Sequence, residues 1–125
     1  RLPYSSALKL AAGASANIIL EAEAEESPFY PGKLADYLAV ARPILALTPG
    51  SSTVRDILGA DYDLLCRPND VDAICRSLKL IFRCWAAGNA ERLAPSERAR
   101  SHASEETALR ELRRLESFIM NGCSE

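Results

Sequence analysis

The chain has 125 residues, of which 48% are hydrophobic and 26% charged, with a formal net charge of −2. This length and composition are typical of one soluble globular domain that can bury a core. The nearly neutral charge gives no electrostatic reason to expect a nucleic-acid partner. No apolar run reaches the roughly 18 residues that a membrane-spanning helix requires.

The predicted elements alternate between helices and short apolar strands. A helix over 5–13, capped by Ser5 or Ser6, precedes a buried strand over 17–21. An acidic loop follows, and a helix over 31–41 then begins at a proline, which suits a first helical position.

The second half of the pattern repeats this alternation. A second apolar strand covers 43–48, and a turn then leads into a short helix that ends at Gly59. A weaker strand over 62–66 precedes a long helix from Asp70 to Gly88. The last predicted helix covers 104–120, with an apolar stripe made of Leu109, Leu112, Leu115 and Ile119.

Short apolar strands that alternate with helices predict an α/β fold with a parallel, Rossmann-like sheet and flanking helices. About three strands are expected, whereas a complete lobe of this kind has about six. We therefore interpret the chain, which starts at Arg1 without a methionine, as part of a lobe. Residues 1–88 form the Rossmann-like portion and 89–125 a helical extension of the same domain. An incomplete sheet leaves an edge through which two copies could pair.

The four cysteines lack the spacing of a zinc site or a C-x-x-C redox motif. Cys75 and Cys84 fall within an apolar helical pattern, where a thiol usually serves as a small hydrophobic side chain. Buried, reduced thiols are thus expected, which favours a reducing compartment such as the cytoplasm. No bound metal is expected, because no cluster of acids and histidines has ligand spacing.

Loops that leave the strands of a parallel sheet line its ligand crevice. Three such loops are predicted, at 21–30, 48–51 and 67–70. The first leads into a helix start where free N–H groups near Gly32, Lys33 and Leu34 favour a phosphate.

Lys33 and Asp36 are three residues apart and share a face of the same helix. A lysine there could meet a diphosphate, and the carboxylate one turn later could accept hydrogen bonds from a ribose diol. The alternative is a weak surface ion pair between the two residues, without a ligand.

The segment 27–38, followed by 42–47, resembles the donor-site segment of GT-B glycosyltransferases of the retaining, GT4-like group. In that family the pattern P-x-K-L-x-[DE]-Y-x-x-x-x-[KR]-P-I lies over the nucleotide-sugar. Two further segments, 2–20 and 67–74, resemble the family's preceding helix and strand and a later helix start. The likeness covers about residues 2–85, which would form part of the C-terminal, donor-binding lobe.

The resemblance implies a nucleotide-sugar as substrate, no cofactor and no metal. Asp36, seven residues before the strand's proline, corresponds to the acid that binds the ribose hydroxyls. A loop of backbone amides would wrap the sugar and diphosphate, and it consists of Pro28, Phe29, Tyr30, Pro31, Gly32 and Lys33. Pro28 departs from the family, which usually has an acid there, and Glu26 is the nearest substitute. Gly50 and Ser51 could make minor contacts.

Acceptor recognition and catalytic groups belong to the other lobe in these enzymes, so the catalytic residues are unknown and the N-terminal lobe is an expected partner. The fragment alone should be inactive. The resemblance also implies a cytoplasmic enzyme, with peripheral attachment to the inner membrane as an alternative for the full-length protein.

Two other functions remain open. One is a non-enzymatic α/β interaction or regulatory module, which would need an acidic pocket with an aspartate directly after a strand; the strands here end in Glu21 and Thr48. The other is a glycosyltransferase-like lobe that is catalytically silent because of Pro28. Gly50 and Ser51 do not begin a P-loop, because no Gly-Lys-Ser/Thr follows.

Overall fold

The computed structural model describes residues 2–122, and its centre is a three-stranded parallel sheet. The strands are β1 (Asn17–Leu20), β3 (Ile44–Leu47) and β5 (Leu65–Cys66), in the order β1-β3-β5. β1 and β3 pair along their whole length, from Asn17 opposite Ile44 to Leu20 opposite Leu47. The predicted parallel α/β sheet is confirmed, and β1 and β5 form its two edges.

A second, smaller parallel sheet joins two segments that were expected to be loops. It consists of β2 (Glu26–Ser27) and β4 (Ser51–Ser52), with Glu26 opposite Ser51. The prediction of loop and turn at these residues was wrong. Each of these strands has only two polar residues, too few to show the alternation of apolar and polar residues that predicts a strand. The two segments come side by side only in the folded chain.

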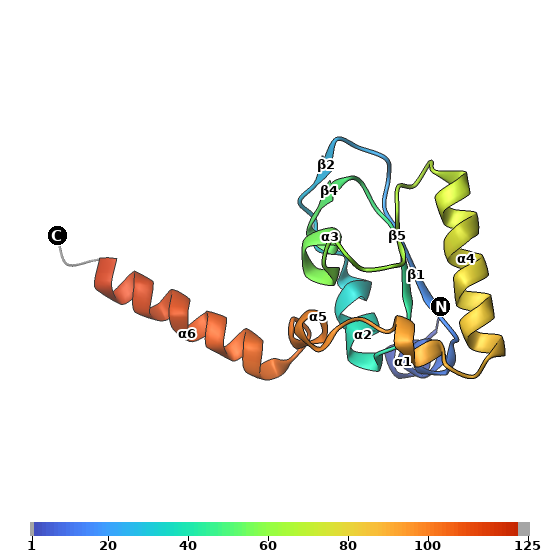
Figure 1. The fold of residues 1–125 in the computed structure, drawn as a ribbon. Helices are drawn as coiled ribbons and strands as arrows, with labels where there is room; N and C mark the ends of the chain where they lie inside the picture. Colours follow the sequence, from blue (N-terminus) through green and yellow to red (C-terminus); the bar gives the residue numbers. More distant parts are fainter. Residues whose placement is uncertain (1, 123–125) are drawn as a thin grey trace.

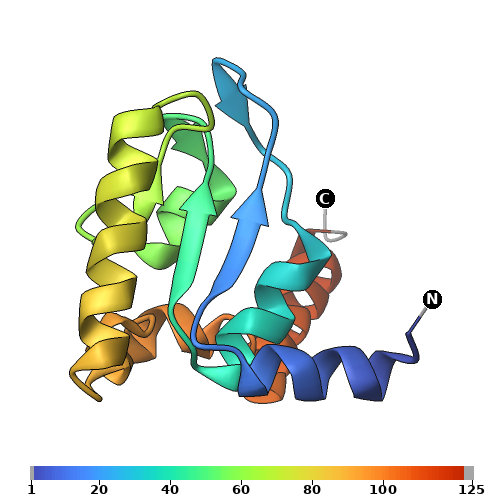
Figure 2. The same cartoon turned by 90° about the vertical axis from the view of Figure 1, so that its right-hand side faces the viewer.

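Helices cover both faces of the main sheet (Figure 1, Figure 2). One face carries α2 (Gly32–Val40), α3 (Thr53–Leu58) and α5 (Glu97–Ser101), and the other carries α4 (Val71–Ala86) and the 3₁₀ helix η1 (Ala90–Leu93). The fully buried side chains lie between these layers and include Leu34, Leu38, Ile44, Leu45, Leu64 and Val54.

Helix α1 (Tyr4–Gly13) packs against α2 (Figure 2). Its N-cap is Pro3, whose carbonyl accepts hydrogen bonds from the N–H groups of Ser6 at 3.1 Å and Ala7 at 3.0 Å. The predicted caps Ser5 and Ser6 were therefore wrong, because both lie inside the first turn. A proline costs no intrahelical hydrogen bond in this position, since the first N–H groups of a helix have no intrahelical partner.

The last helix, α6 (Glu105–Gly122), extends away from the α/β body (Figure 1). Leu109 and Leu112 of its predicted stripe are exposed, while Leu115 and Ile119 lie outside the residues whose side chains are described. Between residues 2 and 122, no helix is both long and apolar enough to cross a membrane.

The apolar pattern of α4 is only partly used by the core. Ser77 and Cys84 are buried against the sheet, but Phe82 and Trp85 are exposed. Cys75, expected to be a buried thiol, is exposed as well, so that prediction was wrong. The predicted burial of Cys84 is confirmed.

Candidate functional site

The three loops at the carboxyl ends of the strands are linked to one another. β2 lies in the first loop and β4 in the second, and their pairing joins them. Thr53, at the start of α3, also donates a hydrogen bond to the carbonyl of Pro28 at 2.9 Å. Arg67 in the third loop forms an ion pair with Glu23 in the first, at 2.8 Å. The three loops thus form one surface at this edge of the sheet.

Beneath this surface, Glu21 directly follows β1 and accepts two hydroxyl hydrogen bonds. Ser27 donates to Oε1 at 2.6 Å, and Thr48 donates to Oε2. Thr48 also contacts Ser52 Oγ at 2.6 Å. Because the single hydroxyl proton of Thr48 is directed at Glu21, Ser52 is the donor in this contact. Ser52 Oγ in turn accepts the N–H of Arg55 at 3.1 Å and caps α3.

This network is a structural anchor. Thr48 is completely buried, and Ser27 and Ser52 are nearly so. Both oxygens of Glu21 are engaged, so the carboxylate is not an open acid. The sequence shows that Glu21 and Thr48 end two predicted strands, but their contact was not predicted. The available signal was that both residues come at the carboxyl end of a strand in a parallel sheet.

Helix α2 starts at this edge without a side-chain cap. Its N-cap is Pro31, whose carbonyl accepts the N–H of Leu34 at 2.8 Å, so the prediction of a free N–H at Leu34 was wrong. Pro31 has no side-chain acceptor to offer the N–H groups of Gly32 and Lys33, and both residues are exposed. A Cβ placed on Gly32 would meet no atom within 4 Å, so the space beside Gly32 is open. Such an end can bind an anion through its N–H groups and the helix dipole.

One turn further along α2, Asp36 lies between two tyrosines. Tyr4 of α1 donates a hydrogen bond to Asp36 Oδ1 at 2.7 Å, and this bond, followed by the charge of Asp36, raises the pKa of Tyr4. The pKa of Tyr30 is raised first by partial burial and then by the charge of Asp36. The carboxylate therefore contacts α1, and its charge also acts on Tyr30 in the loop before α2.

Lys33 and Asp36 line the same hollow, which has a volume of about 430 Å³ and lies between α1 and α2. The predicted sharing of one face is thus confirmed. The rest of the lining is largely apolar, with Leu8 and Ala11 from α1 among its residues. The hollow combines one cation, one carboxylate and apolar walls, which is the usual composition of a small-molecule site.

The other predicted site residues lie at the tip of the surface. Glu26 and Ser51 are opposite each other in the β2–β4 pair. The exposed members of this group are Glu26, Pro28, Phe29, Gly50 and Ser51. Phe29 has 76% of its surface exposed, so an apolar ring stands at the tip without cover.

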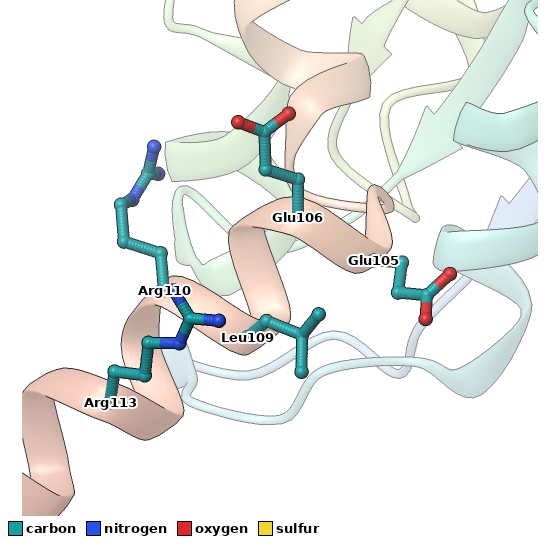
Figure 3. A pocket seen from close by; sticks show the side chains of 5 residues that line it. All are labelled: Glu105, Glu106, Leu109, Arg110 and Arg113. Atoms are coloured by element: carbon teal, nitrogen blue, oxygen red, sulfur yellow. The ribbon is translucent and has the colours of Figure 1, made fainter.

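A further hollow lies along α6 and is lined by Glu105, Glu106, Leu109, Arg110 and Arg113 (Figure 3). The described lining comes from this helix alone, with acidic and basic side chains on either side of Leu109. Glu106 and Arg110 are four residues apart, a spacing that suits a solvated helix face. Among the described residues, no cluster of acids, cysteines or histidines could hold a metal ion.

Comparisons with protein-family models, with curated proteins and with solved structures found no match to this chain.

Proposed function

We propose that this chain is part of the donor-binding lobe of a GT-B glycosyltransferase of the GT4-like group, and that it binds a nucleotide-sugar. The likeness over residues 2–85 supports the proposal, and the three-stranded parallel sheet with flanking helices is compatible with such a lobe. The parent enzyme would act in the cytoplasm, with its N-terminal lobe as the partner across the cleft.

The observation that carries the proposal is the start of α2. Its N–H groups have no side-chain cap, and Lys33 and Asp36 of the same helix line one hollow between α1 and α2. The diphosphate binds the N–H groups of Gly32 and Lys33 and the Lys33 ammonium. The ribose hydroxyls donate to Asp36, which has acceptor positions beyond the one that Tyr4 occupies.

This arrangement also fits the chemistry of sugar transfer. The bond between the anomeric carbon and the diphosphate oxygen breaks, and the acceptor hydroxyl oxygen forms the new bond as it loses its proton. Negative charge then develops on the departing diphosphate, where fixed N–H groups and a lysine stabilise it most effectively. The acceptor and the remaining catalytic groups belong to the other lobe, so this chain alone binds donor without turnover.

Two alternatives are less well supported. A receiver-like module needs an open acid directly after a strand, whereas the carboxylate of Glu21 accepts two hydroxyl hydrogen bonds. A silent lobe would follow from Pro28 at the usual acidic position. The exposed Glu26, opposite Ser51 in the β2–β4 pair, places a carboxylate on the same surface. Activity of the full-length parent would distinguish an active lobe from a silent one.

The test is an amide-shift NMR titration of the chain with UDP-, GDP- and ADP-sugars. We expect saturable shifts confined to residues 32–36 and the loop before them, with one base preferred. Lys33→Ala and Asp36→Asn should each weaken binding about tenfold or more, the range of a lost charge-assisted hydrogen bond. Asp56→Asn, an exposed acid on α3, is the matched control and should leave affinity unchanged. The site is wrong if both α2 variants bind like the wild type, and absence of any shift would contradict donor binding by this chain.

A further inference from the structure

Helix α4 carries a second apolar stripe that the core does not use. It consists of Val71, Cys75, Leu78, Phe82 and Trp85, at alternating spacings of four and three residues. All five side chains are exposed, with Val71 at 67%, Leu78 at 48% and Phe82 at 62%. This is the spacing of a helix-packing seam, in which each side chain fits between side chains of a facing helix. Monomeric proteins rarely leave such a stripe uncovered.

Exposed apolar side chains also lie on the sheet beside this helix. On the opposite flank of α4, Arg76 and Leu80 line a hollow together with Cys66 of the β5 edge. The stripe therefore faces the other way, toward β1, where Ile18 and Leu20 are 53% and 71% exposed. In Figure 2, α4 stands beside the strands and no helix lies in front of β1. Ile18 pairs with Leu45, which packs with α4, so the α4 flank and the exposed residues of β1 lie on the same face of the sheet; together we call them the uncovered apolar surface.

We propose that a second copy of this chain covers this surface, with the two α4 helices packed antiparallel across a twofold axis. Such an interface is isologous, so the stripe must complement itself. In one antiparallel register, Val71 lies opposite the second copy's Phe82, and Cys75 lies opposite the second copy's Leu78. Each small side chain then meets a larger one, which lets the seam interdigitate.

Charge selects the same register. Asp72 and Lys79 are seven residues apart, so both lie on the same side of the stripe. The antiparallel register brings Asp72 beside the second copy's Lys79, and twofold symmetry makes this pair twice. A register one heptad further along would instead place Lys79 beside the second copy's Lys79. Charges that flank a helix seam commonly set orientation and register in this way.

Pairing through the open edge of the sheet is a weaker alternative. The N–H groups of Asn17 and Glu21 donate to the carbonyls of Pro43 and Leu47, so those of Ile18 and Leu20 point to the open side. β1 has only four residues, and short edge strands discourage edge-to-edge pairing. The larger apolar surface belongs to α4 and the face of β1.

The proposal is tested by sedimentation equilibrium of the full chain at micromolar concentrations. The expected mass is twice the 13.6 kDa of the chain. Leu78→Asp should weaken association about tenfold or more, because it buries an unpaired charge at the seam. Arg76→Asp, on the other flank of the same helix, should leave the dimer intact, and circular dichroism checks that each variant folds.

A charge exchange tests the register. Asp72→Lys and Lys79→Asp should each weaken the dimer about threefold to tenfold, the effect of replacing a solvated attraction with a repulsion. The double variant should recover the wild-type association. Failure of the double variant to recover overturns the antiparallel register, and a monomer at all concentrations overturns the proposal.

Association that survives Leu78→Asp but is lost in Ile18→Pro, which removes an outward N–H, would be edge pairing instead. None of these outcomes depends on donor binding.

Discussion

The phenol of Tyr4 lies 2.7 Å from Asp36 Oδ1 and joins α1 to α2 across 32 residues of sequence. No ion pair joins the described side chains of Lys33 and Asp36, so Asp36 does not form the surface pair that was the alternative to a ligand site. The tyrosine holds the carboxylate at the hollow between the helices, and Lys33 lines the same hollow with its charge available to an anion. A carboxylate that is oriented in this way is better prepared for a ribose diol than a mobile surface acid.

Asp36→Asn should lower the pKa of both Tyr4 and Tyr30. In the folded chain the pKa of Tyr4 is raised, first by its hydrogen bond to Asp36, and this variant removes the negative charge that favours the neutral phenol. NMR of the tyrosine rings during a pH titration would show the change residue by residue. Asp63→Asn is the matched control, because it should lower the pKa of Tyr62 and leave Tyr4 unchanged. An unshifted Tyr4 in Asp36→Asn would contradict the contact.

Gly32→Ala should separate a requirement of the fold from a requirement of the ligand. A Cβ at Gly32 meets nothing within 4 Å, so the variant should be as stable as the wild type or more stable by about 0.5–1 kcal/mol. It should nevertheless weaken nucleotide-sugar binding if the diphosphate approaches the backbone there. Gly59→Ala is the contrasting variant and should lower the stability of the fold, because Gly59 has a φ of +96° and Asp61 lies 3.0 Å from the added Cβ. Urea unfolding and the NMR titration measure the two effects, and equal affinity in Gly32→Ala would argue against close approach.

Much of the fold follows from local pattern. β1 and β3 are unbroken apolar runs bounded by turns, and α2 and α4 have clear helical periods, so each was predicted close to its observed bounds. The β2–β4 pair was not, because its four polar residues have no apolar period and come from two segments far apart in the sequence. Periodicity also could not show which of the two apolar flanks of α4 meets the sheet. That choice left Phe82 exposed and Cys84 buried.

The site divides in the same way. Lys33 and Asp36 share a helix face by spacing alone, and this could be predicted from the sequence. Tyr4, the hydrogen-bond partner of Asp36, could not be predicted, because its contact depends on how α1 crosses α2. The hydrogen bond between Thr48 and Glu21 depends in turn on the register of β1 with β3, which pairs Leu20 with Leu47.

Thr48→Val should destabilise the protein by about 1–3 kcal/mol. The variant keeps the buried volume but removes the hydroxyl between Glu21 and Ser52, which leaves polar groups without a partner in a buried position. Thr48→Ser keeps the hydroxyl and should lose less. Urea unfolding measures both free energies of unfolding. If Thr48→Val were as stable as Thr48→Ser, the network would not be the anchor of this loop surface.

Tyr62→Phe should destabilise the protein by about 1–3 kcal/mol and should also change how its stability depends on pH. The Tyr62 hydroxyl donates to the carbonyl of Leu93 at 2.8 Å and accepts the N–H of Ile44 at 2.9 Å, so the variant leaves two backbone groups unpaired. Burial is the main cause that raises the pKa of Tyr62 from 10.0 to about 12 in the folded chain.

Because the pKa of Tyr62 is higher in the folded than in the unfolded chain, its stabilising contribution is complete below pH 10 and is lost as the pH rises toward 12. Urea unfolding at several pH values should therefore show a steeper loss of stability between pH 10 and 12 for the wild type than for Tyr62→Phe. Identical slopes for the wild type and Tyr62→Phe would mean that this phenol ionises as readily in the folded chain as in the unfolded one.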